Sequence, residues 1–170
     1  MKVEVTLFDT CNEWAKLRWT TVAARENAGC NLPFKRVEIP KEPGLYRLTW
    51  HNKETWKQVK KEIEAKATKS IKNNRVAFEV LEPPVVLSIG KTTKLRNRLA
   101  QHFGNNKNNN RILARLRQIL PGKSDDEIRE LGRTSITLEV VVVKCWVLRC
   151  QLERFGAAIQ HPILDFDAEH

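Results

Sequence analysis

The segment 85–91, Val-Val-Leu-Ser-Ile-Gly-Lys, limits the folds open to this chain more than any other part of the sequence. Its apolar residues predict a buried strand, and the glycine near its end predicts a tight turn. Residues 93–103 then predict a helix whose apolar stripe is formed by Leu95, Leu99 and Phe103. A strand that leads through a turn into an amphipathic helix is typical of a fold that mixes a sheet with covering helices.

The remaining pattern is that of an α+β protein. Residues 44–50 alternate as a strand does, and the β-branched run at 136–143 is typical of a central strand. We therefore expect a small central antiparallel sheet of about three strands, flanked by helices. Helices are expected at residues 11–24, 51–75, 111–120, 125–131 and 147–160, and further short strands at 3–7 and 76–80. The last helix is expected to turn Leu148, Leu152, Phe155 and Ile159 toward the core.

The chain is long enough for one domain. Its 170 residues can bury a single hydrophobic core. We divide it into an N-terminal extension, residues 1–40, packed on the core, and a core domain at 41–170. The basic helical segment is an insertion at residues 51–80, between the strands at 44–50 and 85–89.

The charge balance favours a polyanionic partner. The chain has 30 lysines and arginines against 20 aspartates and glutamates, which leaves a net charge of +10. An excess of this size favours nucleic acid, because each phosphate contact releases condensed counterions. The alternative is a basic surface without a dedicated partner.

Cysteine usage and the N-terminal sequence predict a reduced, cytoplasmic protein. The four cysteines form no CxxC pair and have no nearby histidine at zinc spacing, which argues against a zinc site. Cys145 and Cys150 lie in an apolar stretch and are expected to behave as small hydrophobes. The sequence has no signal-peptide pattern and no apolar run of transmembrane length, so we expect no membrane partner.

Two side chains on the helix after Gly90 suit phosphodiester chemistry. Arg98 and His102 are four residues apart and therefore share a helix face, beside the apolar stripe and at the border between core and solvent. An arginine can offset negative charge on a phosphate, and an imidazole can accept or pass on a proton. The alternative is a basic helix with one incidental histidine.

A carboxylate and a lysine add to this set. Glu153 lies on an otherwise apolar helix, one turn before Gly156, where a small residue allows another element to approach closely. A single carboxylate there suits a hard divalent cation, and the alternative is an ion pair with Arg149. Lys91, directly after the glycine, could lower the pKa of a nearby phenol or bind phosphate, and the alternative is an ordinary exposed lysine.

In chain order, these residues resemble the GIY-YIG nuclease family. The segment Gly44-Leu45-Tyr46 is similar to the first half of the family motif, and Ser88-Ile89-Gly90 to the second. Ser88 replaces the second motif tyrosine, and Tyr46 is the only tyrosine in the chain. The family's further positions are occupied here by Arg98, His102 and Glu153, with Asp165 where the family usually has asparagine.

The resemblance implies a metal-dependent DNA endonuclease that hydrolyses phosphodiester bonds, in the manner of restriction-type or small stand-alone members. It implies that Glu153 holds Mg²⁺ or Mn²⁺ and that Arg98 braces the scissile phosphate. The proton of the attacking water is then managed by Tyr46, helped by His102 or Lys91. Double-stranded DNA as substrate, a role in restriction or defence, and a homodimer that cuts both strands are further expectations.

Basic residues outside this set are expected to bind the DNA. We expect the insertion and the loop at 104–111 to wrap around the DNA duplex. A catalytically impaired GIY-YIG-like protein that only binds nucleic acid is the main alternative, since Ser88 is not a base. A basic RNA-binding protein without nuclease ancestry is a third possibility. The expected nucleic-acid-binding residues are Lys57, Lys60, Lys61, Lys94, Lys107, Arg111 and Arg115.

Overall fold

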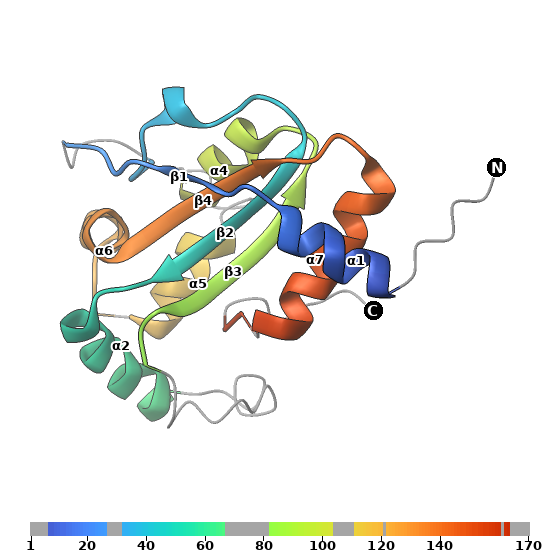
Figure 1. Cartoon of the computed structure of the whole chain (residues 1–170). Helices are drawn as coiled ribbons and strands as arrows, with labels where there is room; N and C mark the ends of the chain where they lie inside the picture. The colour runs from blue at the N-terminus through green and yellow to red at the C-terminus, as the bar shows by residue number, and fades with distance from the viewer. Residues whose placement is uncertain are drawn as a thin grey trace.

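The computed structural model describes residues 7–26, 32–66, 82–103, 111–120, 122–160 and 162–163. These residues form an α+β fold in which helices surround one antiparallel sheet (Figure 1). The strands are β1 (Thr20–Val22), β2 (Gly44–Trp50), β3 (Val85–Thr92) and β4 (Ile136–Val142). The helices are α1 (Leu7–Lys16), α2 (Lys53–Lys66), α4 (Leu95–Phe103), α5 (Arg111–Ile119), α6 (Asp125–Ser135) and α7 (Trp146–Gln160), with a 3-10 turn at Arg36–Glu38.

The sheet has the order β1-β4-β2-β3, and each neighbouring pair is antiparallel. The expected α+β class is confirmed, and β4 is an interior strand as its β-branched sequence predicts. The sheet has four strands rather than about three, because Thr20–Val22 pairs along the free edge of β4. Among the strands of the described residues, β3 lies at the edge of the sheet.

The start of the chain differs most from expectation. The helix expected at 11–24 ends at Lys16, and Leu7, expected in a strand, already lies in it. Two threonines and a valine follow at 20–22, residues that favour strands, and Val22 is buried in the core. Residues 1–40 thus supply a strand of the sheet as well as the helix α1. The strand expected at 76–80 lies outside the described residues.

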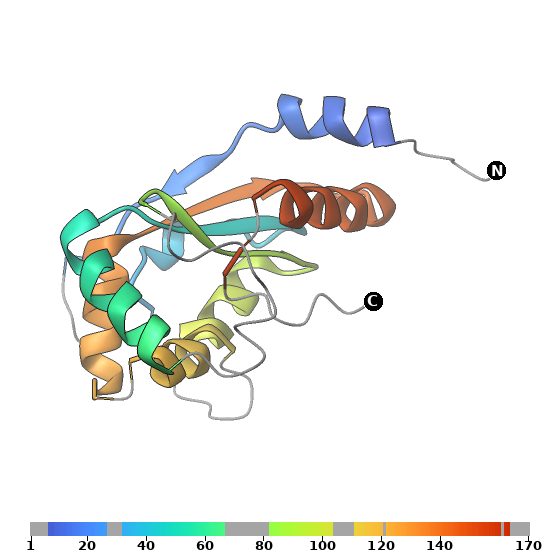
Figure 2. The ribbon, with the colours of Figure 1, turned by 90° about the horizontal axis from the view of Figure 1, so that it is seen from below.

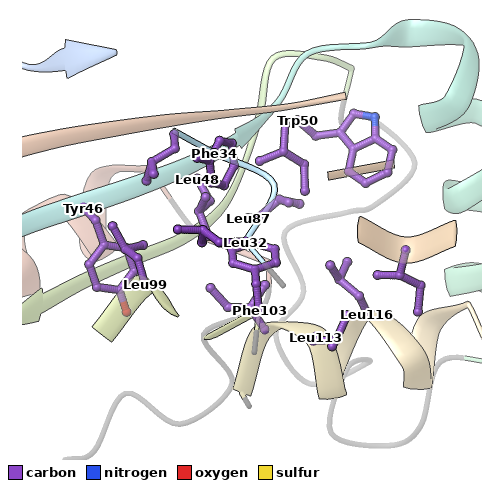
Figure 3. Packing of buried hydrophobic residues seen from close by; sticks show 14 of the residues in the cluster. Leu32, Phe34, Tyr46, Leu48, Trp50, Leu87, Leu99, Phe103, Leu113 and Leu116 are labelled. Carbon is purple, nitrogen blue, oxygen red and sulfur yellow. The ribbon is translucent and has the colours of Figure 1, made fainter. Parts of the chain in front are cut away.

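The two faces of the sheet carry separate apolar clusters. In Figure 2 the helices α2, α4, α5 and α6 lie on one side of the sheet and α1 lies on the other. The larger cluster, part of which is shown in Figure 3, fills the space between the sheet and these four helices. The smaller cluster lies on the opposite face, against α7 and α1. Its buried members are Leu45, Val143 and Leu152, with Trp14, Leu17, Trp19, Val141 and Leu148 packed around them.

Two details of the C-terminal region are corrected. Ile159 does not face the core, because it lies near the end of α7 and is 49 % exposed. Cys145 is exposed in the turn before α7 rather than buried as a small hydrophobe. No helix in the described part of the chain combines the length and apolarity needed to span a membrane.

At Gly156, the helix α7 packs closely against α1. A Cβ atom built at Gly156 would lie 2.3 Å from the Trp14 ring, so the indole packs directly on the helix backbone. The close approach expected at this glycine is therefore confirmed, and its partner is the N-terminal helix. Trp14 also contacts the rings of Trp19 and Phe155, with centroid distances of 5.7 and 5.9 Å.

Substitution of Gly156 by valine is expected to displace Trp14 and to lower the free energy of unfolding by about 1–3 kcal/mol, the usual range for overpacking. Urea denaturation followed by tryptophan fluorescence measures both effects. Ala158→Val is the matched control, because Ala158 is exposed on the same helix and carries the same β-branched penalty. Equal stability of the two variants would contradict the docking of Trp14 on Gly156.

Candidate active site

The pairing of β2 with β3 places Tyr46 opposite Gly90. A Cβ atom built at Gly90 would lie 2.2 Å from the Tyr46 hydroxyl oxygen and 2.3 Å from the adjoining ring carbon Cζ. The tyrosine ring therefore occupies the space that any side chain at position 90 would need. The turn expected at Gly90 is wrong, because β3 continues to Thr92 and Gly90 lies within the ladder.

Tyr46 and His102 form a buried hydrogen-bonded pair. The Tyr46 Oη atom lies 2.6 Å from His102 Nε2, and the ring centroids are 5.2 Å apart. Relative exposure is 4 % for Tyr46 and 2 % for His102, so the histidine does not lie at the border between core and solvent as expected. It is held there because Leu99 and Phe103, its neighbours on α4, are themselves fully buried. A proton can pass directly between the phenol and the imidazole.

Ser88 lies on the same side of the sheet as this pair. It is opposite Leu48 in the ladder, two residues before Gly90, and two-residue spacing keeps side chains on one face. The serine is 4 % exposed and belongs to the core layer beside Tyr46. Position 88, to which the resemblance assigns a second tyrosine, thus has a buried hydroxyl of much smaller size.

Glu153 on α7 is bound by Lys91 on β3. The Lys91 backbone N–H donates to Glu153 Oε1 at 2.9 Å, and the Lys91 ammonium donates to Oε2. The side chains are 29 % and 22 % exposed, so the ion pair is partly shielded from water. The alternative pairing with Arg149 is not formed, because the buried Arg149 guanidinium donates to the Val143 carbonyl at 2.7 Å.

A polar cleft of about 400 Å³ opens where β3 ends and α4 begins. Its lining contains three cationic side chains and no carboxylate. The Arg98 guanidinium makes no ion pair with a carboxylate among the described residues, and a guanidinium lining a cleft suits an anion such as phosphate. The lining residues are Lys91, Lys94 and Arg98 together with Thr92, Thr93, Asn97 and Gln101.

The candidate residues therefore meet around the end of one edge strand. Tyr46 and His102 lie on the face of the sheet that α4 covers, while Glu153 approaches from α7, which contacts the other face through Leu152. Gly90 and Lys91 are consecutive in β3, so their side-chain positions alternate between these faces. Lys91 touches Glu153 and also lines the cleft that contains Arg98.

Glu153 is the described carboxylate that could hold a cation at this site. No cluster of three or more His, Cys, Asp or Glu side chains suitable for a metal occurs within the described residues. Mg²⁺ does not need such a cluster, because one or two carboxylates suffice when water and phosphate complete its six positions. The Lys91 ammonium on Oε2 marks a place where this carboxylate already holds positive charge. The residues present thus fit a hard cation held by a single carboxylate.

The expected nucleic-acid-binding residues fall into separate groups. Lys94 borders the cleft, whereas α2, with exposed Lys57 and Lys61 and partly buried Lys60, follows the opposite end of β2. Six residue steps of β2 correspond to about 20 Å, so one phosphate cannot reach both groups. Arg115 lies partly buried on α5, and Arg111 begins that helix with a side chain outside the description. Lys107 and Asp165 lie outside the described residues.

Comparison with known proteins gives no match. No family model fits the sequence, and neither curated proteins nor solved structures contain a significant match to the chain.

The cleft contains polar residues that the sequence alone did not single out. Asn97 and Gln101 are four residues apart on α4, next to Arg98, and line the same cleft. Their helical spacing relative to Lys94 and Arg98 is visible in the sequence, and a search for one continuous polar face on residues 94–101 would have found them.

Proposed function

We propose that the protein is a divalent-metal-dependent DNA endonuclease of the GIY-YIG type. The observation that supports this most is the hydrogen bond between Tyr46 and His102 over Gly90, because it couples the phenol to a proton acceptor. Lys91, the residue after Gly90, contacts Glu153 and lines the same cleft as Arg98. A core packed only for stability does not need a cation-lined cleft beside a buried phenol–imidazole pair.

In this proposal each residue has a separate task. A phosphate of the substrate lies in the cleft, where Arg98 donates charge-assisted hydrogen bonds to it and Lys94 adds a second positive charge. Glu153 holds a divalent cation, which when bound supplies Lewis-acid stabilisation of the charge that develops on the phosphate. The attacking water gives its proton to the Tyr46 oxygen, while the Tyr46 proton passes to His102 Nε2.

This proton route assigns His102 a role through Tyr46. Because the Nε2 atom of the imidazole lies 2.6 Å from the phenol oxygen, we infer that His102 accepts the phenol proton rather than that of water. The route requires the tautomer in which Nε2 carries no proton before the reaction. Ser88 takes no part in it, since an aliphatic hydroxyl is too weak a base near neutral pH.

A nicking assay with Glu153→Gln tests the proposal. We expect the purified protein to nick or cut plasmid DNA with Mg²⁺ or Mn²⁺ and not with EDTA, and the variant to be slower on the order of a hundredfold, because the metal contribution is several kcal/mol. Glu139→Gln is the matched control. Glu139, on β4, is a carboxylate whose exposure is similar to that of Glu153, and it is paired with Arg47 at 2.8 Å. Its variant is expected to cut at close to the wild-type rate.

Two other results would change the assignment. If the protein binds DNA but does not cut it with any divalent metal, it is the catalytically impaired, GIY-YIG-like binding protein. Cutting by Glu153→Gln at the wild-type rate would remove Glu153 from the site while leaving the activity itself intact. The restriction or defence role and the homodimer remain predictions.

A further inference from the structure

Both oxygens of the Glu153 carboxylate are engaged by the same residue. The Lys91 backbone N–H donates to Oε1, and the Lys91 ammonium donates to Oε2. The first contact comes from a strand backbone that is fixed by its pairing with Leu45. The second comes from a flexible side chain of four methylene groups. The carboxylate can therefore keep its position while the ammonium leaves.

The ammonium stands where a second cation would have to bind. Two positive charges on one carboxylate oxygen repel each other, and the repulsion is stronger here than in bulk water because the pair is only 22–29 % exposed. A divalent cation that takes Oε2 must accordingly displace the Lys91 ammonium. The cleft that Lys91 also lines is the open space beside it, and phosphate is the anion that its cations suit.

We propose that Lys91 is a latch on Glu153, closed by its ammonium and opened by a divalent cation, and that the released ammonium binds substrate phosphate in the cleft. This inference rests on the proposed function. The Lys91 ammonium then has two positions, one on Glu153 and one in the cleft. The cation and the phosphate both favour the position in the cleft. Binding of either ligand then strengthens binding of the other, and by linkage the factor is the same in both directions.

Mn²⁺ binding without nucleic acid tests the closed latch. Free Mn²⁺ is followed by electron paramagnetic resonance at low ionic strength for the wild type, Lys91→Met and Lys94→Met. Lys94→Met is the matched control, because Lys94 lines the same cleft and the same charge is removed, but no described contact joins it to Glu153. Lys91→Met is expected to bind Mn²⁺ roughly tenfold more tightly than the wild type, within the usual range for coupled sites, and Lys94→Met less than about threefold.

Two further variants complete the experiment. Lys91→Arg keeps a cation against Oε2 and is expected to bind Mn²⁺ no more tightly than the wild type, which separates displacement from any general loosening of the fold. Glu153→Gln in the Lys91→Met background is expected to remove the gain in affinity. Equal Mn²⁺ affinity of Lys91→Met and Lys94→Met would overturn the latch and leave the proposed function standing. Mn²⁺ binding that Glu153→Gln does not change in any background would instead overturn the metal site on which both proposals rest.

Discussion

Gly90→Ala is expected to inactivate the protein and to destabilise it. The added methyl group would lie 2.2 Å from the Tyr46 oxygen and 2.3 Å from Cζ, and a buried ring cannot yield without leaving its site. Its departure breaks the hydrogen bond to His102 and forces repacking around Leu99. Overpacking costs about 1–3 kcal/mol, and loss of a buried hydrogen-bond partner about 1–3 kcal/mol more. Urea denaturation measures the loss in stability, and the plasmid assay measures the loss of cleavage.

Two comparisons separate the steric explanation from a general effect of replacing glycine. Gly122→Ala adds the same methyl group where no atom lies within 4 Å, and the change in stability is expected to stay within about 0.5 kcal/mol. In a Tyr46→Ala background, Gly90→Ala is expected to cost much less than in the wild type, because the ring is already absent. A cost that is the same in both backgrounds would mean that the tyrosine ring is not what excludes a side chain at position 90.

Gly90 also illustrates what the sequence could and could not predict. Local periodicity predicts the strand that contains it and the helix after it. The four-residue spacing of Arg98 and His102 predicts that they share a face of that helix. Its reason for being glycine does not, because that reason is the ring of a residue 44 positions earlier, placed there by the β2–β3 register. A glycine near the end of an apolar run is typical of a turn. The structure instead uses it for close packing within a strand.

The same limit explains the environments of His102 and Glu153. Helical spacing places Arg98 and His102 on one face of α4, and that much is confirmed by the helix. Whether the histidine is buried depends on Tyr46 from another strand. For Glu153, local spacing offered Arg149 as the partner, whereas the actual partner, Lys91, is 62 residues away. Sequence periodicity reports the face of a helix, and tertiary packing decides which residues that face meets.

The strand β1 at the edge of the sheet is a further element that local periodicity does not predict. Residues 20–22 continue a helical pattern when only apolar spacing is considered, yet they form β1 against β4. Thr20 and Thr21 favour a strand, and Val22 is buried when the segment pairs. Three residues are too few for a periodicity argument, so the fourth strand follows from the available edge of β4 rather than from the segment itself.

Tyr46→Phe is expected to reduce cleavage about a thousandfold while DNA affinity stays near that of the wild type, since general acid–base groups typically contribute 10²–10⁴. Phenylalanine keeps the ring over Gly90 and removes only the oxygen that meets His102 Nε2. Stability should fall by only about 1–3 kcal/mol, the cost of removing one partner of a buried hydrogen bond. Cleavage rates at saturating DNA, together with binding in EDTA, separate these effects. Ser88→Ala is the control, because it removes a buried hydroxyl from the same face two residues away.

The role of His102 can be tested with a double variant that combines His102→Gln with Tyr46→Phe. If the imidazole acts only by accepting the phenol proton, His102→Gln should slow cleavage in the wild type and add little once Tyr46 is phenylalanine, because groups that act as a unit are not additive. Unfolding curves for each variant ensure that the rates compare folded proteins. Independent, multiplicative losses would mean that His102 reaches the reaction without Tyr46. Undiminished cutting by Tyr46→Phe would exclude the phenol as the base, and because Tyr46 is the only tyrosine in the chain, no other phenol could replace it.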